Sequence, residues 1–138
     1  MSRSKLGNKA IIIDGQRFDS RAEARRYGQL RMLERAGEIS DLQRQKTYEL
    51  IPGHYEYLPT GKIFSRGVRK GQKEYKRVTV ELPVKYIADF VYKDKDGNTV
   101  VEDVKGYSNP KSATYAKFVI KRKLMLWLHG VKVKEVKI

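Results

Sequence analysis

The stretch Tyr86–Lys105 constrains the fold most, because it places charged residues inside two strand-forming runs. The two runs flank an Asp-Gly-Asn turn at residues 96–98, which predicts a β-hairpin. Asp89 lies in the first run and Asp103 in the second. Lys105 follows Asp103 by two residues, so these two side chains share one face of their strand. Because buried unpaired charges are costly, three charges on one hairpin require an explanation such as a bound metal ion.

The length of the turn decides whether Asp89 joins that face. A two-residue loop would pair Asp89 with Val104 and would turn Asp103 to the other side. A three-residue loop pairs Asp89 with Lys105, and a five-residue loop or a single bulge gives the same parity, so that all three charges converge. The sequence allows this convergent register but does not force it.

The balance of charged residues indicates which class of partner the chain binds. The chain has 138 residues, a length typical of one domain, with 30 Lys and Arg against 16 Asp and Glu and a formal net charge of +14. Such an excess favours nucleic acid, because Lys and Arg neutralise phosphates. We expect no membrane association, since no run of about 18 apolar residues and no apolar signal region is present. The absence of cysteine excludes disulfides and zinc–thiolate sites and fits a reducing, cytoplasmic compartment.

A helix is expected from about Ser20 to Ala36, and its apolar stripe includes Tyr27, Leu30 and Leu33. One turn before Tyr27, the same stripe reaches Glu23. Glu23 also completes a Ser-x-x-Glu capping box, in which its carboxylate folds back onto the cap amide. Capping alone would account for Glu23, and the need for a third acid near the hairpin is the argument for a further role.

Residues 52–77 are expected to form a long basic loop, because they combine two prolines and four glycines with many cations and aromatic residues. Such a mixture suits contact with a phosphate backbone and stacking on a base, although a charged run is often only solvated. The candidate nucleic-acid contacts in this loop are Lys62, Arg66, Arg69, Lys70 and Lys73.

A second helix is expected from about Lys111 to His129. Lys117 and Lys121 lie one turn apart on it and are either a solvated face or further DNA contacts. The apolar stripe expected to face the core is Ala113, Ala116, Ile120, Leu124 and Trp127.

The remaining segments complete an α/β pattern. Residues 1–9 are interpreted as a basic, mobile arm, and residues 10–138 as a single domain. Ala10–Phe18 has the signature of a hairpin, Ile39–Ile51 that of a strand, and Val131–Lys137 that of a half-buried strand with lysines on one face. The order of elements predicts an α/β fold with a central mixed sheet flanked by helices.

In the convergent register, the three charged side chains would suit the binding of a metal ion. Two or three carboxylates at one point bind a hard cation through oxygen, and Mg²⁺ needs few protein ligands because it keeps several waters. A neighbouring lysine adds positive charge where a phosphoryl transition state is most negative. The combination indicates metal-dependent hydrolysis of a nucleic-acid phosphodiester. The competing interpretation is structural, with Asp89 forming a salt bridge with Lys105 across the hairpin and Asp103 exposed at a strand end.

Asp89 followed by Asp103-Val104-Lys105 on the next strand resembles the PD-(D/E)xK nuclease superfamily. Ala88 stands where the written motif has proline, and the second acid is Asp instead of the commoner Glu. The resemblance covers roughly residues 10–130. Within the superfamily, the chain is similar to small phage-encoded members, including enzymes that resolve Holliday junctions.

The resemblance implies a restriction-endonuclease-like core and assigns roles to the site. Asp89 and Asp103 would ligate Mg²⁺ with the Val104 carbonyl, and Mn²⁺ would substitute. Lys105 would be the catalytic lysine, and Glu23 a metal ligand or catalytic group. Glu102 is a rival for the second acid, but its parity places it on the opposite face from Lys105.

The leading hypothesis is a phage-derived, Mg²⁺-dependent DNA endonuclease that acts on branched intermediates of recombination or replication, with a homodimer as the candidate assembly. The alternative is a basic DNA-binding module whose acids are only structural.

Overall fold

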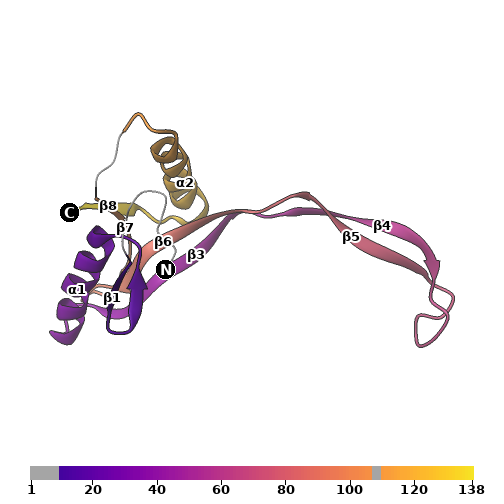
Figure 1. Cartoon of the computed structure of the whole chain (residues 1–138), viewed down its shortest axis with the longest axis horizontal. Coiled ribbons are helices and arrows are strands. Elements are labelled where there is room, and N and C mark those ends of the chain that lie inside the picture. Colours follow the sequence, from indigo (N-terminus) through magenta and orange to yellow (C-terminus); the bar gives the residue numbers. More distant parts are fainter. Residues whose placement is uncertain (1–9, 107–109) are drawn as a thin grey trace. The chain divides into compact units, whose positions relative to one another are not determined.

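The computed structural model describes residues 10–106 and 110–138, so the arm predicted for residues 1–9 lies outside the described residues. The chain divides into two compact units, of which one is Glu49–Lys85 and the other comprises the residues before and after that segment. Figure 1 shows the elements in chain order. They are β1 (Ile11–Ile13), β2 (Gln16–Phe18), α1 (Arg21–Arg35), β3 (Ser40–Ile51), β4 (His54–Ile63), β5 (Lys73–Glu81), β6 (Val84–Lys93), β7 (Thr99–Lys105), α2 (Ala113–His129) and β8 (Val133–Lys137).

The first unit confirms the predicted α/β fold. Its main sheet has the strand order β3-β6-β7-β8, in which β6 and β7 are antiparallel and β7 and β8 are parallel, so the sheet is mixed. The N-terminal hairpin of β1 and β2 forms a separate two-stranded sheet, as the Asp-Gly turn predicted.

Both helices have the predicted limits because their caps are encoded in the sequence. The Ser20 hydroxyl accepts a hydrogen bond from the Glu23 amide at the start of α1, and the Ser112 hydroxyl accepts one from the Tyr115 amide at the start of α2. Gly130 ends α2 in the left-handed conformation, with a φ of 66°.

The core lies between α1 and the sheet. It contains Phe18 and Ile39 together with the helix residues Ala24, Tyr27 and Leu30 and the strand residues Phe90, Tyr92 and Val104. Leu33 was expected on this buried stripe and is instead 37% exposed, because the stripe turns away from the sheet near the end of the helix. The face of β7 that carries Val104 therefore packs against α1, which leaves the Asp103 and Lys105 face for α2.

The predicted apolar stripe of α2 is wrong. Phe118 and Met125 are the buried residues, whereas Ile120 is 59% and Trp127 81% exposed. Ala113 and Ala116 are exposed as well, and Leu124 is half-buried. Apolar residues occur all around this helix, so its periodicity does not select one face.

The predicted loop at residues 52–77 is also wrong, because most of it is a hairpin. The second unit consists of β4 and β5, which pair antiparallel and run side by side as a ribbon (Figure 1). Residues 64–72 join them and are closed by hydrogen bonds from the Phe64 amide to the Gln72 carbonyl and from the Gly71 amide to the Phe64 carbonyl. Alternating tyrosine, valine and threonine residues favour strands here, and the glycine and proline content concealed that signal.

Candidate active site

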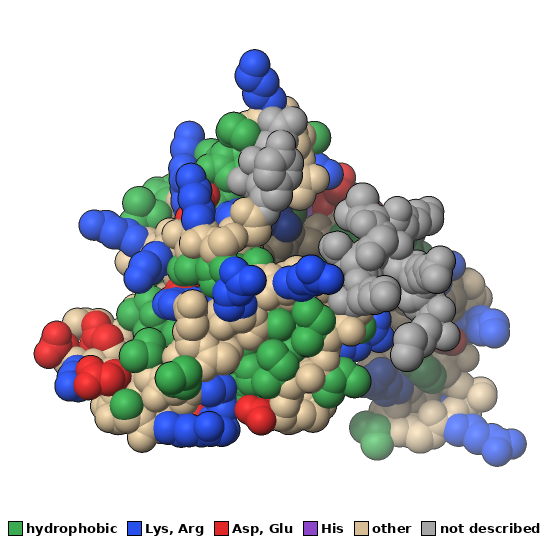
Figure 2. All heavy atoms as spheres, turned by 60° about the vertical axis from the view of Figure 1, so that its left-hand side comes forward, with side chains coloured by type: hydrophobic (Ala, Val, Ile, Leu, Met, Phe, Trp, Pro, Cys, Tyr) green, Lys and Arg blue, Asp and Glu red, His purple; other side chains and the backbone are tan. Residues whose placement is uncertain are grey.

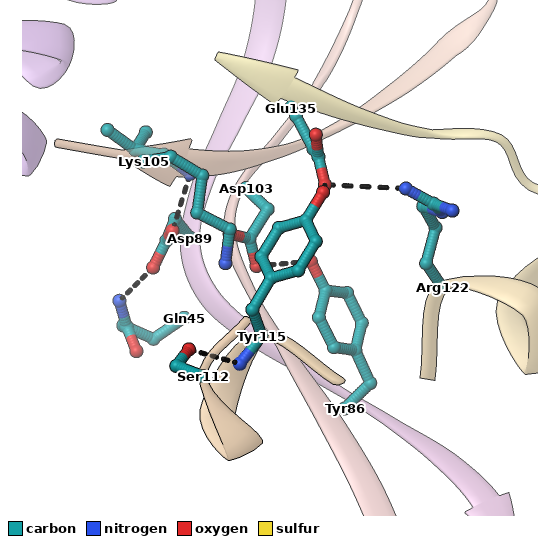
Figure 3. Close-up of polar contacts among 10 residues, drawn as sticks. Gln45, Tyr86, Asp89, Asp103, Lys105, Ser112, Tyr115, Arg122 and Glu135 are labelled. Carbon is teal, nitrogen blue, oxygen red and sulfur yellow. Dashed lines mark hydrogen bonds and ion pairs between the residues drawn. The ribbon is translucent and has the colours of Figure 1, made fainter. Parts of the chain in front are cut away.

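The β6–β7 hairpin has the convergent register. Lys93 pairs with Thr99, so the turn contains five residues, and the ladder continues to Phe90 opposite Glu102. One residue further, Asp89 lies beside Asp103. Lys105 is on the same face, and its Nζ atom is 2.7 Å from Oδ1 of Asp103. The structure therefore brings Asp89, Asp103 and Lys105 together, as a turn of this parity predicts (Figure 3).

At the end of the hairpin, the side chain of Asp89 accepts a main-chain hydrogen bond in place of a carbonyl group of the neighbouring strand. Its Oδ2 atom accepts a hydrogen bond of 2.8 Å from the Val104 amide, and its Oδ1 atom accepts one of 3.4 Å from the side chain of Gln45 on β3. Burial, with a smaller contribution from the negative charge of Asp103, raises the pKa of Asp89 to about 6, although the hydrogen bond from the Val104 amide acts in the opposite direction. The Asp89 carboxylate is thus held in place by hydrogen bonds. The positive charge around it does not offset the cost of ionising a buried carboxyl group beside Asp103.

Asp103 is almost fully buried and has a donor for each oxygen. Lys105 contacts Oδ1, and the hydroxyl of Tyr86 donates to Oδ2 over 2.8 Å. Burial, followed by the charge of Asp103, raises the pKa of Tyr86, so this tyrosine remains a hydrogen-bond donor. Nζ of Lys105 is also 3.7 Å from the ring centroid of Phe118 on α2, an arrangement that orients the amine without neutralising it.

Glu23 belongs to the same electrostatic cluster. Burial raises its pKa to about 7, and the next cause is the charge of Asp89, with a smaller contribution from Asp103. Arg44 acts in the opposite direction. The cap bond from the Glu23 amide to Ser20 is present, but none of the hydrogen bonds between described residues joins the Glu23 carboxylate to the Ser20 amide. The carboxylate is therefore not committed to the capping box.

Glu102 is on the opposite face, as its parity predicted, and is a structural residue. Its side chain is fully buried and forms two hydrogen bonds to Arg26, of 2.8 and 2.7 Å, and a short one from the hydroxyl of Tyr92. The bond to Glu102 raises the pKa of Arg26, and burial raises that of Tyr92 to about 12. Because Glu102 points to the face that packs against α1 and is paired there with Arg26, it cannot join Asp89 and Lys105 as the second acid of the site.

Four neighbours of the site were not predicted from the sequence. Tyr86 orients Asp103, and Glu135 lies beside Asp103 in the parallel register of β7 and β8. Tyr115 and Arg122 of α2 hold Glu135, at 3.2 and 3.4 Å (Figure 3). A signal for Glu135 existed, since it interrupts the alternation of valine and lysine in the last strand.

The predicted DNA contacts fall into two groups. Lys62, Lys73 and the loop residues Arg66, Arg69 and Lys70 are exposed in the second unit, whereas Lys117 is exposed and Lys121 half-buried on α2. Figure 2 shows Lys and Arg side chains spread over the visible face, with fewer Asp and Glu side chains among them.

The donor set suits a hard cation, since it consists of carboxylate oxygens whose mutual repulsion is only partly offset by Lys105. Within the described residues, no group of three or more His, Cys, Asp or Glu side chains is placed to hold a metal ion. A cation here would therefore depend on Asp89 and Asp103, supplemented by main-chain and water oxygens, which is the coordination that Mg²⁺ accepts.

The fold and site define an α/β protein with an acidic, lysine-bearing site at the end of a central hairpin. The chain belongs to the family described as protein of unknown function (DUF1064), whose model matches residues 3–137. No curated protein and no solved structure matches the chain. In the part of the chain that the structure describes, no helix is long and apolar enough to cross a membrane.

Proposed function

We propose that this chain is a Mg²⁺-dependent endonuclease that hydrolyses phosphodiester bonds in DNA. The observation that carries the proposal is the meeting of Asp89 and Asp103 across the β6–β7 hairpin, with the amine of Lys105 on the second carboxylate. A chain with a net charge of +14 attracts a polyanion to its surface, and an acid cluster on such a chain needs a cation before a phosphate can approach it.

Asp89, Asp103 and the Val104 carbonyl are the groups that would hold Mg²⁺, and Mn²⁺ would replace it. The chemistry supplied by the ion would be neutralisation of phosphoryl charge and activation of the attacking water. The Val104 amide and Gln45 fix the Asp89 carboxylate, and Tyr86 fixes that of Asp103, so both are preorganised by groups that remain outside the reaction.

Lys105 is assigned the stabilisation of negative charge that develops on the phosphate. Its amine is partly buried, and a fixed charge of this kind is stronger where water is scarce. Glu23 is the candidate proton acceptor for the attacking water, because a carboxylate with a pKa of about 7 can accept a proton near neutral pH.

The proposed fold is the restriction-endonuclease-like core, and the proposed substrate is branched DNA of the Holliday-junction type. A junction has two-fold symmetry, so a homodimer would suit it. A phage-encoded enzyme of this kind would act in the cytoplasm of the host cell.

A second candidate is a DNA-binding module whose acids are only structural. The specific observation in its favour is that each oxygen of Asp103 already has a protein donor, Lys105 or Tyr86. The site would then be a buried polar network that stabilises the hairpin.

A cleavage panel separates the two candidates. Purified protein would be incubated with Mg²⁺ and with junction, flap, single-stranded and linear duplex DNA, in parallel with Asp103→Asn and with Asp41→Asn as a matched exposed control. The proposal predicts cleavage of the junction by the wild type and by Asp41→Asn, and none by Asp103→Asn. Absence of cleavage on every substrate, or equal cleavage by Asp103→Asn, would reject it.

A further inference from the structure

The hairpin of the second unit has two unlike faces. In its regular part, Tyr55 pairs with Thr79, Tyr57 with Arg77, and Pro59 with Tyr75. Because side chains alternate along a strand, these six residues lie on one face of the ribbon. We call this surface the tyrosine face. It contains every tyrosine of the second unit and no acid.

The opposite face has a different composition. Glu56 pairs with Val78 and Leu58 with Lys76, and Glu74 follows on the same side of β5 by alternation. Two acids and two aliphatic residues therefore lie on this side of the ribbon with one cation, Lys76, whereas the tyrosine face has a cation and no acid. The tyrosine face is thus the side that accepts a polyanion more readily.

Two tyrosine rings are open to a ligand. Tyr57 is 66% and Tyr75 54% exposed. They are diagonal neighbours across the two strands, a relation in which side chains on one face are within about 7–8 Å of each other. Large apolar rings left open beside cations are the components of surfaces that stack nucleobases.

Tyr55 and Arg77 form the fixed part of this face. The guanidinium of Arg77 lies 4.4 Å from the centroid of the Tyr55 ring. A Cβ atom added at Gly53 would lie only 2.6 Å from the Tyr55 hydroxyl, so the tyrosine ring in this position fills the space beside residue 53. Arg77 thus lies on the tyrosine face, opposite Tyr57 in the strand pairing and against the Tyr55 ring, and supplies a positioned cation for a phosphate.

We propose that the tyrosine face binds single-stranded DNA, with Tyr57 and Tyr75 stacking on unpaired bases and Arg77 contacting the backbone. Paired bases within a duplex are stacked on each other and present only their edges, so duplex DNA would use the cations but not the rings. The inference rests on the proposed action on DNA and specifies the form recognised, which is DNA with an unpaired segment, such as a flap or an open junction.

Charge favours this occupant over a second copy of the chain. Between Lys62 and Arg77 there are seven Lys and Arg residues and one acid, Glu74. Two such ribbons face to face would repel each other, whereas a phosphate backbone would be attracted.

The test measures binding without cleavage. Fluorescence anisotropy in EDTA would give the affinity of the full chain for a fluorescent oligothymidine and for a blunt duplex. The variants are Tyr57→Ala and Tyr75→Ala, with Tyr57→Phe and Tyr75→Phe to retain the rings and Leu58→Ala to truncate the opposite face. Each alanine variant at a tyrosine should weaken oligothymidine binding about 5- to 150-fold and leave duplex binding unchanged, whereas the phenylalanine variants and Leu58→Ala should bind as the wild type does.

An unchanged affinity of both alanine variants for oligothymidine would overturn the inference, as would an equal loss on duplex. A shift of oligomeric state in the alanine variants, measured by light scattering, with unchanged affinity would instead assign the face to a second copy. If the wild-type protein binds oligothymidine through these rings but cleaves no DNA with Mg²⁺, the nuclease proposal is refuted and the inference about single-stranded DNA stands.

Discussion

Replacing Asp89 with asparagine should stabilise the metal-free protein at pH 8. The pKa of Asp89 is raised from 3.8 to about 6, mainly by burial, so the fold disfavours the ionised form. That difference corresponds to at most about 3 kcal/mol. Solvent screening at a half-buried side chain reduces it to about 1–2 kcal/mol. Asparagine is nearly the same shape and can still accept the hydrogen bond from the Val104 amide.

The sign of the effect depends on pH. Because the folded pKa lies above the unfolded one, the penalty is absent below about pH 3.8, grows between pH 4 and 6, and is complete above about pH 6. Wild-type stability should therefore fall across this window, and Asp89→Asn should lose that fall. The two proteins should be equally stable at pH 3.5, and at pH 8 the variant should unfold about 3–10 °C higher.

Thermal unfolding in EDTA, followed by circular dichroism at both pH values, measures this difference. Asp41→Asn is the matched control. Asp41 is exposed and adopts a φ of 57°, a conformation that asparagine tolerates equally well. Asp89→Asn that was destabilised at pH 8 as much as at pH 3.5 would show that the carboxylate serves the hairpin, and the electrostatic reasoning would be refuted. A stabilised variant would mark a residue retained at a cost to the fold, as functional residues often are.

Three further predictions concern other parts of the chain. Lys105→Met should lower the cleavage rate about 10²- to 10³-fold with little change in DNA affinity; a loss confined to affinity, measured by separate binding and single-turnover assays, would contradict a catalytic role. Glu102→Ala should lower the free energy of unfolding by about 3–5 kcal/mol in urea titrations, because it leaves the mostly buried Arg26 without its ion-pair partner. A decrease below about 1 kcal/mol would show that this ion pair does not stabilise the fold. Arg66→Glu combined with Lys70→Glu should weaken binding to all DNA sequences and lower the salt slope by about 2; an unchanged slope would remove the loop between β4 and β5 from the interface.

The convergence of three charged side chains on one face of the hairpin was predictable, because it depends on strand parity and parity can be read from residue spacing. The positions of Asp89, Asp103 and Lys105 left only the turn length open. The structure settles that length through Asp94, whose Oδ1 atom accepts hydrogen bonds of 2.9 Å from the amides of residues 96 and 98 and so organises a five-residue turn. Asp96-Gly97-Asn98 marks the turn in the sequence, but the side chain that organises the turn belongs to Asp94, two residues earlier.

Tertiary contacts decided what the sequence could not. Phe118 is buried because it packs against Tyr86 and under the amine of Lys105, and nothing within α2 itself distinguishes it from Ile120 or Trp127. The pairing of Tyr86 with Asp103 likewise joins two strands at a site that no local motif marks. Periodicity gives the number and type of the elements, but the choice among several apolar faces belongs to packing.

The most direct test of the account is whether Asp89 and Asp103 together bind a divalent cation. Isothermal titration of Mg²⁺ into metal-free protein at pH 8, without DNA, measures this for the wild type, Asp103→Asn and Asp41→Asn. The account predicts saturable binding by the wild type and by Asp41→Asn, and none by Asp103→Asn. Equal binding by all three proteins, or none by the wild type, would contradict it.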